Sequence, residues 1–79
     1  MKLPRDLSGR ELVKILCRDW SYRQVSQVGS HVVLEIEEPS HHRIAVPDHA
    51  TLRVGTLNAI LRAVARHKNV DRERLLRGR

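Results

Sequence analysis

The chain has 79 residues and a formal net charge of +6, from fifteen Lys and Arg residues against nine Asp and Glu residues. This length predicts one small domain with a thin core, because a chain of this size buries only about 60–65% of its unfolded surface. The single cysteine, Cys17, excludes an internal disulfide and a cysteine-rich zinc site. No apolar run approaches the roughly 20 residues that span a bilayer, so we expect a cytoplasmic protein without membrane association.

The positive charge lies in the two terminal segments of the chain. Residues 1–30 carry six basic and three acidic groups, and residues 53–79 carry eight and two. Residues 31–52 carry one arginine against four acidic groups. Twelve of the fifteen basic residues are arginines, whose guanidinium groups bind phosphate in a bidentate way. This distribution predicts a polyanionic partner, although solubility charge on helix surfaces is an alternative interpretation.

Helical patterns stand at both ends of the chain. Ser8 begins a capping box, and the apolar residues that follow have helical spacing, which predicts a helix over about residues 8–19. Gly55 and Thr56 open a second apolar stripe, with Thr56 expected as the N-cap. A short terminal helix is expected over about residues 71–77, with Asp71 as its N-cap.

Three strand-like segments lie between the helices. They cover residues 22–28, 31–37 and 42–46, separated by turns at residues 29–30 and 38–41. The second segment alternates most clearly, with three aliphatic side chains, those of Val32, Leu34 and Ile36, on one face. The other face carries His31, Val33, Glu35 and Glu37, so His31 and Val33 are expected to face solvent.

The order of these elements is α-β-β-β-α with a terminal helix. It predicts an α+β fold in which a three-stranded antiparallel sheet carries the helices on one face. We expect one domain over residues 1–79, with its core at about residues 8–68. His31 would then lie on the opposite, open face of the sheet.

Three short motifs occur in this order: Gly29-Ser30-His31, the Val46–His49 stretch with proline at its second position, and the Gly55–Arg62 helix opening. Together they resemble the HicA family, which has a fold like that of double-stranded-RNA-binding domains. The resemblance covers about residues 8–64. It implies an RNA-cleaving toxin (an mRNA interferase) that acts on mRNA, pairs with a HicB-like antitoxin and uses His31 as its catalytic residue.

RNA carries its own nucleophile in the 2′-hydroxyl, so a nuclease that uses it needs no metal and no cofactor. Such a site needs a proton acceptor, a proton donor and positive charge on the phosphate. His31 is a candidate general acid or base, and Ser30 can bind the phosphate or orient the ring. The candidate phosphate-binding or RNA-binding cations are all basic side chains, namely Arg23, Arg43, Arg53, Arg62, Arg66 and Lys68.

Other interpretations remain open at this point. His31 can be a surface histidine that ends a turn, and His49 is expected to be a loop residue without a catalytic role. His41 and His42 are adjacent on a strand and point to opposite faces, which does not favour a metal site. The alternatives to an enzyme are a non-catalytic RNA-binding module and a protein-interaction domain of the same fold.

Overall fold

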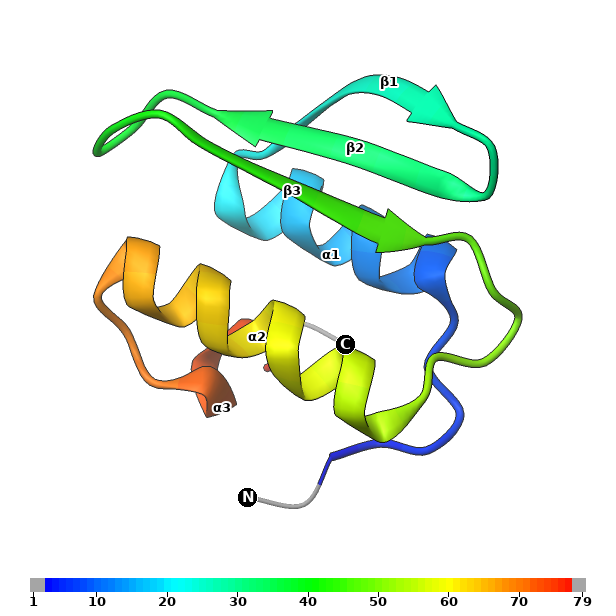
Figure 1. Ribbon diagram of the computed structural model, residues 1–79. Helices are drawn as coiled ribbons and strands as arrows, with labels where there is room; N and C mark the ends of the chain where they lie inside the picture. Colours follow the sequence, from blue (N-terminus) through cyan, green and yellow to red (C-terminus); the bar gives the residue numbers. More distant parts are fainter. Residues whose placement is uncertain (1–2, 78–79) are drawn as a thin grey trace.

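The computed structural model describes residues 3–77, which form one sheet with helices on one of its faces (Figure 1). The three strands are antiparallel and lie in the order β1-β2-β3. This arrangement confirms the α-β-β-β-α order and the α+β class expected from the sequence. Along the chain the elements are α1 (Gly9–Trp20), β1 (Arg23–Val28), β2 (His31–Ile36), β3 (His42–Pro47), α2 (Val54–Lys68) and α3 (Arg72–Leu75).

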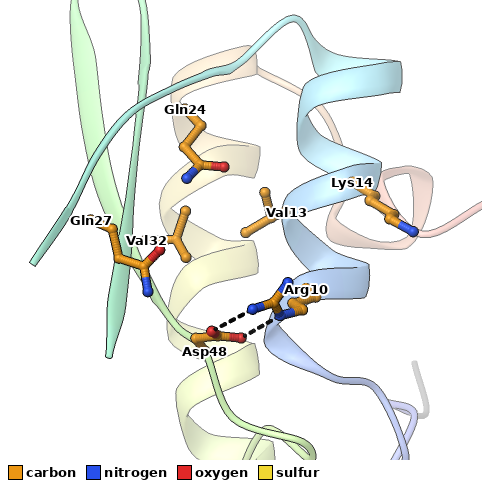
Figure 2. Close-up of a pocket in the computed structure, with 7 residues that line it drawn as sticks. All are labelled: Arg10, Val13, Lys14, Gln24, Gln27, Val32 and Asp48. Carbon is orange, nitrogen blue, oxygen red and sulfur yellow. Dashed lines mark hydrogen bonds and ion pairs between the residues drawn. The ribbon is translucent and has the colours of Figure 1, made fainter. Parts of the chain in front are cut away.

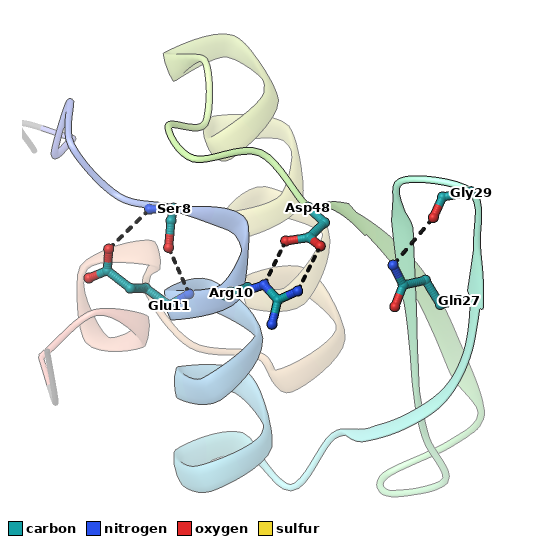
Figure 3. Close-up of polar contacts among 6 residues, drawn as sticks. All are labelled: Ser8, Arg10, Glu11, Gln27, Gly29 and Asp48. Carbon is teal, nitrogen blue, oxygen red and sulfur yellow. Dashed lines mark hydrogen bonds and ion pairs between the residues drawn. The ribbon is translucent and has the colours of Figure 1, made fainter.

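Helix α1 starts at the predicted capping box (Figure 3). The backbone N–H of Glu11 donates to the Ser8 hydroxyl at 3.1 Å, and the Glu11 carboxylate accepts from the Ser8 N–H at 3.2 Å. These two contacts satisfy backbone groups that the first helical turn leaves free. The helix ends at Trp20, and its C-cap, Ser21, adopts the left-handed conformation with φ 65°.

Helix α2 starts earlier than the sequence predicts. Its N-cap is Arg53, not Thr56, and no side chain caps it. The Arg53 carbonyl already accepts the first helical hydrogen bond, from the N–H of Leu57 at 2.9 Å. The preceding residue, Leu52, is buried, and its N–H donates to the Leu7 carbonyl at 2.8 Å. This anchor fixes where the chain turns into the helix and outweighs the local capping preference of Thr56.

The C-terminal segment packs against α1 and α2. Asp71 is the N-cap of α3, as predicted, although its side chain makes no capping hydrogen bond. Leu75 is fully buried, and its carbonyl accepts a 3.2 Å hydrogen bond from the Trp20 indole. Trp20 is half-buried and packs against the core. No helix in residues 3–77 has the length and the apolar character needed to cross a membrane.

The core lies between the sheet and the helices. Alternate side chains of β2 enter it, since Val32, Leu34 and Ile36 are all buried there. Val33 points to the other face, yet it is only 8% exposed, so the expectation that Val33 faces solvent is wrong. The reason is its place in the middle strand, where Ser26 of β1 and Ala45 of β3 flank it directly.

Candidate functional site

His31 is the first residue of β2 and follows the turn that joins it to β1. Gly29 in that turn has φ 58°, a left-handed conformation that glycine adopts without steric cost. His31 pairs with Val28 on β1 and with Pro47 on β3. Paired residues of a sheet share a face, so the imidazole lies between these two side chains on the open face. It is exposed, as the alternation along β2 predicts.

The loop after β3 lies directly beside this turn. The N–H of Asp48 donates to the carbonyl of Ser30 at 2.6 Å. The same loop is held to α1, because the N–H of Gly9 donates to the His49 carbonyl at 2.9 Å. A β-carbon on Gly9 would collide with the carbonyl oxygen of Pro47, so only glycine permits this approach. Three segments distant in sequence thus meet at one end of the sheet.

Arg10 adds a cation to this end of the sheet. Its Nε and Nη2 atoms lie 3.1 and 3.3 Å from the two carboxylate oxygens of Asp48 (Figures 2 and 3). The Arg10 side chain is 79% exposed and that of Asp48 is 20% exposed. Sequence reasoning missed Arg10, because nothing in the sequence pairs the first turn of a helix with a loop 38 residues further on.

The predicted cations do not all gather at His31. Arg23 and Arg43 both pair with Glu35, four residues from His31 along β2, which corresponds to roughly 13 Å. They occupy the open face at the far end of the sheet. Arg53 is exposed and ends the loop that begins beside His31. Ser30 is exposed in the turn itself.

The cations predicted on α2 lie in its second half, away from the loop beside His31. Arg62 and Arg66 are exposed and line hollows between α2 and α3. Lys68 instead faces the sheet, where its ammonium lies 3.4 Å from the Glu38 carbonyl and 5.8 Å from the centre of the Tyr22 ring. These three residues therefore do not form one surface.

A tyrosine and two histidines cluster at the start of β3, at the opposite end of this strand from His31. The Tyr22 hydroxyl and Nδ1 of His42 are 2.8 Å apart, and the rings of His42 and His67 stack at 4.4 Å. Burial lowers the pKa of His42, and the neighbouring His67 and His41 lower it further. Burial raises the pKa of Tyr22 to about 12. The rings are nearly parallel, at 15°, so their nitrogen lone pairs do not converge on a point where a metal could bind.

One group of possible metal ligands occurs within residues 3–77, formed by Glu35, Glu37 and His41. Their ligand atoms lie within 4.8 Å of one another at the exposed end of the β2–β3 hairpin. An ion pair of 3.4 Å between His41 and Glu35 accounts for part of this proximity. The group lies at the end of β2 opposite His31, so it cannot serve chemistry at that histidine.

Comparison with known proteins gives one match. The family model described as the HicA toxin of bacterial toxin–antitoxin systems matches residues 9–65, which is more than half of the chain. No curated protein and no solved structure matches it. The matched region includes α1, the whole sheet and most of α2, and therefore every segment that meets at His31.

Proposed function

The chain belongs to the HicA family of toxins from bacterial toxin–antitoxin pairs, and we propose that it is an RNA endonuclease whose catalytic residue is His31. RNA cleavage is a general property of this family, and the fold provides a surface suited to it. The observation that supports His31 most directly is its exposure on the open face, at the point where the Ser30 turn and the Asp48 loop join.

The reaction uses the 2′-hydroxyl of the RNA as the nucleophile. Its oxygen forms a bond to the adjacent phosphorus, and the bond from phosphorus to the 5′-oxygen of the next nucleotide breaks. The 2′-hydroxyl loses a proton and the departing 5′-oxygen gains one. His31 carries out one of these proton transfers, and water carries out the other. The products are a 2′,3′-cyclic phosphate and a 5′-hydroxyl.

Polar and basic side chains on this face hold the RNA backbone. Ser30 lies at the His31 end and offers a hydroxyl to a phosphate oxygen there. Arg53 caps α2 on the helix side of the sheet, so it is not part of this face. Arg23 and Arg43 flank Glu35 at the other end and hold a phosphate further along the strand. The RNA therefore lies along the open face, on the side away from α1 and α2.

The partner of a HicA toxin is its antitoxin, and we infer that a HicB-like antitoxin covers the same open face. Val28 pairs with His31 and is 67% exposed, which leaves an apolar side chain beside the imidazole. A protein seated there would keep RNA from His31 without moving any strand. Inhibition would then be a simple competition between antitoxin and RNA for one surface.

The test compares purified His31→Ala with His49→Ala, since both histidines are exposed and they follow Ser30 and Asp48, the two residues whose hydrogen bond joins the turn to the loop. On a long RNA, we expect His31→Ala to lose about 10²–10⁴-fold in cleavage rate, the usual value of one positioned acid or base. We expect His49→Ala to retain most activity. Both variants should keep the circular dichroism spectrum of the wild type.

Two further readouts separate the mechanism from its alternatives. Cleavage should persist in EDTA, and the 5′ ends of the products should accept phosphate from polynucleotide kinase without prior dephosphorylation. Equal cleavage by His31→Ala and wild type would refute the assignment of His31. RNA binding without any cleavage by the wild type would favour a non-catalytic RNA-binding module instead.

A further inference from the structure

A hollow of about 190 Å³ lies between α1 and the free edge of the sheet, at the same end as His31 but on the helix side (Figure 2). Its apolar floor comes from Val13 on α1 and Val32 on β2. Polar and charged side chains form its rim, contributed by α1, β1 and the loop after β3, namely Arg10, Lys14, Gln24, Gln27 and Asp48.

The rim offers hydrogen-bonding groups that the protein itself leaves available. The Gln27 amide nitrogen donates to the Gly29 carbonyl at 3.3 Å, which leaves the amide oxygen of Gln27 to accept from a ligand (Figure 3). The Gln24 side chain has no hydrogen-bond partner within residues 3–77, so both its donor and its acceptor are available. Arg10 neutralises the Asp48 carboxylate, and the ammonium of Lys14 has no ion-pair partner in the described part of the chain.

We propose that this hollow holds one unpaired base of the RNA and so selects the sequence that is cleaved. The inference rests on the proposed function, because it takes RNA as the substrate. Proteins recognise single-stranded RNA by splaying bases out and hydrogen-bonding their edges. Two amides above an aliphatic floor provide that chemistry, and the net positive rim suits the attached phosphate. The volume is below that of pockets for drug-sized ligands, which fits a single ring system.

The hollow is also close enough to His31 to act on the same strand of RNA. Gln27 pairs with Val32, and the next pair along the hairpin joins Val28 to His31. The hollow opens at β1, which is an edge strand, so β1 alone, about 4.8 Å from β2 in the plane of the sheet, lies between His31 and this edge. A nucleotide that turns around this edge places its base in the hollow while the neighbouring phosphate stays on the open face.

The experiment uses the full chain with His31→Ala, so that binding is measured without cleavage. Fluorescence anisotropy at low salt would give the affinity for four labelled oligouridylates that differ only in one central base. We expect the protein to prefer one base about tenfold, as a hydrogen-bonded base contact provides. Adding Gln24→Ala should reduce that preference below about threefold, while Ser26→Ala, on the same strand but facing the other way, should leave it unchanged.

A second variant tests the proposed base site without relying on Gln24 alone. Val13→Phe fills the hollow from α1 and should weaken binding of all four RNAs, with circular dichroism as the control for folding. Unchanged base preference in Gln24→Ala would overturn the inference. Weaker antitoxin binding by Gln24→Ala, with RNA binding intact, would also overturn it, because the hollow would then be a contact for the antitoxin. If wild-type protein neither binds nor cleaves RNA, the proposed function itself fails.

Discussion

Arg10 and Asp48 tie the first turn of α1 to the loop after β3 through two hydrogen bonds of 3.1 and 3.3 Å. The same Asp48 donates its backbone N–H to the turn that precedes His31. The ion pair therefore helps to hold in place the loop beside the candidate site. Its effect on stability is expected to be small, because Arg10 is 79% exposed and surface ion pairs are screened by water and salt.

A double-mutant cycle of Arg10→Ala and Asp48→Ala checks this expectation. We expect a coupling energy of about 0.2–1 kcal/mol, which should shrink further in 1 M salt. Urea denaturation of the four proteins would give the free energies of unfolding. A coupling above about 2 kcal/mol would contradict the screened-pair account and would point to a wider network around Asp48.

The contact of Gly9 with Pro47 predicts a larger effect. Gly9→Ala places a methyl group against the Pro47 carbonyl oxygen, and either α1 or the loop must then move. We expect a loss of about 1–3 kcal/mol in the free energy of unfolding, together with slower RNA cleavage. Gly55→Ala is the matched control, since nothing lies within 4 Å of the added carbon, and it should raise stability by about 0.4–1 kcal/mol. Equal effects of Gly9→Ala and Gly55→Ala on the free energy of unfolding would show that the close approach of Gly9 to Pro47 does not determine stability.

The lowered pKa of His42 predicts a loss of stability in mild acid. The native state resists protonation of His42, because burial and the nearby His67 and His41 disfavour the charged ring. The unfolded chain binds the proton at the ordinary pKa of 6.5. The stabilisation is therefore complete above pH 6.5 and is lost as the pH falls from there through the lower pKa of the folded state.

Unfolding midpoints in urea between pH 7.5 and pH 5 would measure this loss. His42→Asn keeps an acceptor near the Tyr22 hydroxyl but does not titrate, so its stability should fall less than that of the wild type over this range. His41→Asn removes the exposed neighbour, whose partner is Glu35, and should keep most of the pH dependence. If the stability of His42→Asn and that of the wild type changed identically with pH, His42 would not be the cause of the loss of stability in acid.

Because Val33 is buried, a substitution there changes stability as well as any contact with the antitoxin, so the exposed Val28 is the better position for testing antitoxin binding. Val33→Asp places a charge at a position that is 8% exposed, so it should cost about 2 kcal/mol or more in folding. Val28→Asp lies at a position that is 67% exposed and should change stability by about 0.5 kcal/mol at most. We expect Val28→Asp to weaken binding of the antitoxin by tenfold or more, a cost of about 1.4 kcal/mol, as measured by titration calorimetry. Unchanged affinity would place the antitoxin elsewhere.

The sequence predicted those features that depend on local pattern. The capping box of Ser8 and the outward direction of His31 both follow from residues within a few positions of each other. The position of the α2 N-cap did not follow, because the Leu52–Leu7 hydrogen bond that sets it joins two distant segments. The burial of Val33 likewise depends on the strands on either side of it.

The same limit applies to the candidate site. The Gly29-Ser30-His31 motif was visible in the sequence, but the partners of that turn were not. The Arg10–Asp48 pair joins residues 38 positions apart, and the hollow beside α1 is lined by residues from three elements and a loop, so periodicity carries no information on either. The stack of His42 on His67 was missed for the same reason, since the two lie on a strand and a helix that meet only in the folded chain.

The hydrogen bond from Asp48 to Ser30 has a consequence for when the surroundings of His31 are completed during synthesis of the chain. A ribosome synthesises the His31 hairpin well before the loop that completes its surroundings, and Leu52 must follow before the loop can anchor to Leu7. The nascent chain thus carries its candidate catalytic histidine in an incomplete setting until most of the chain has left the exit tunnel.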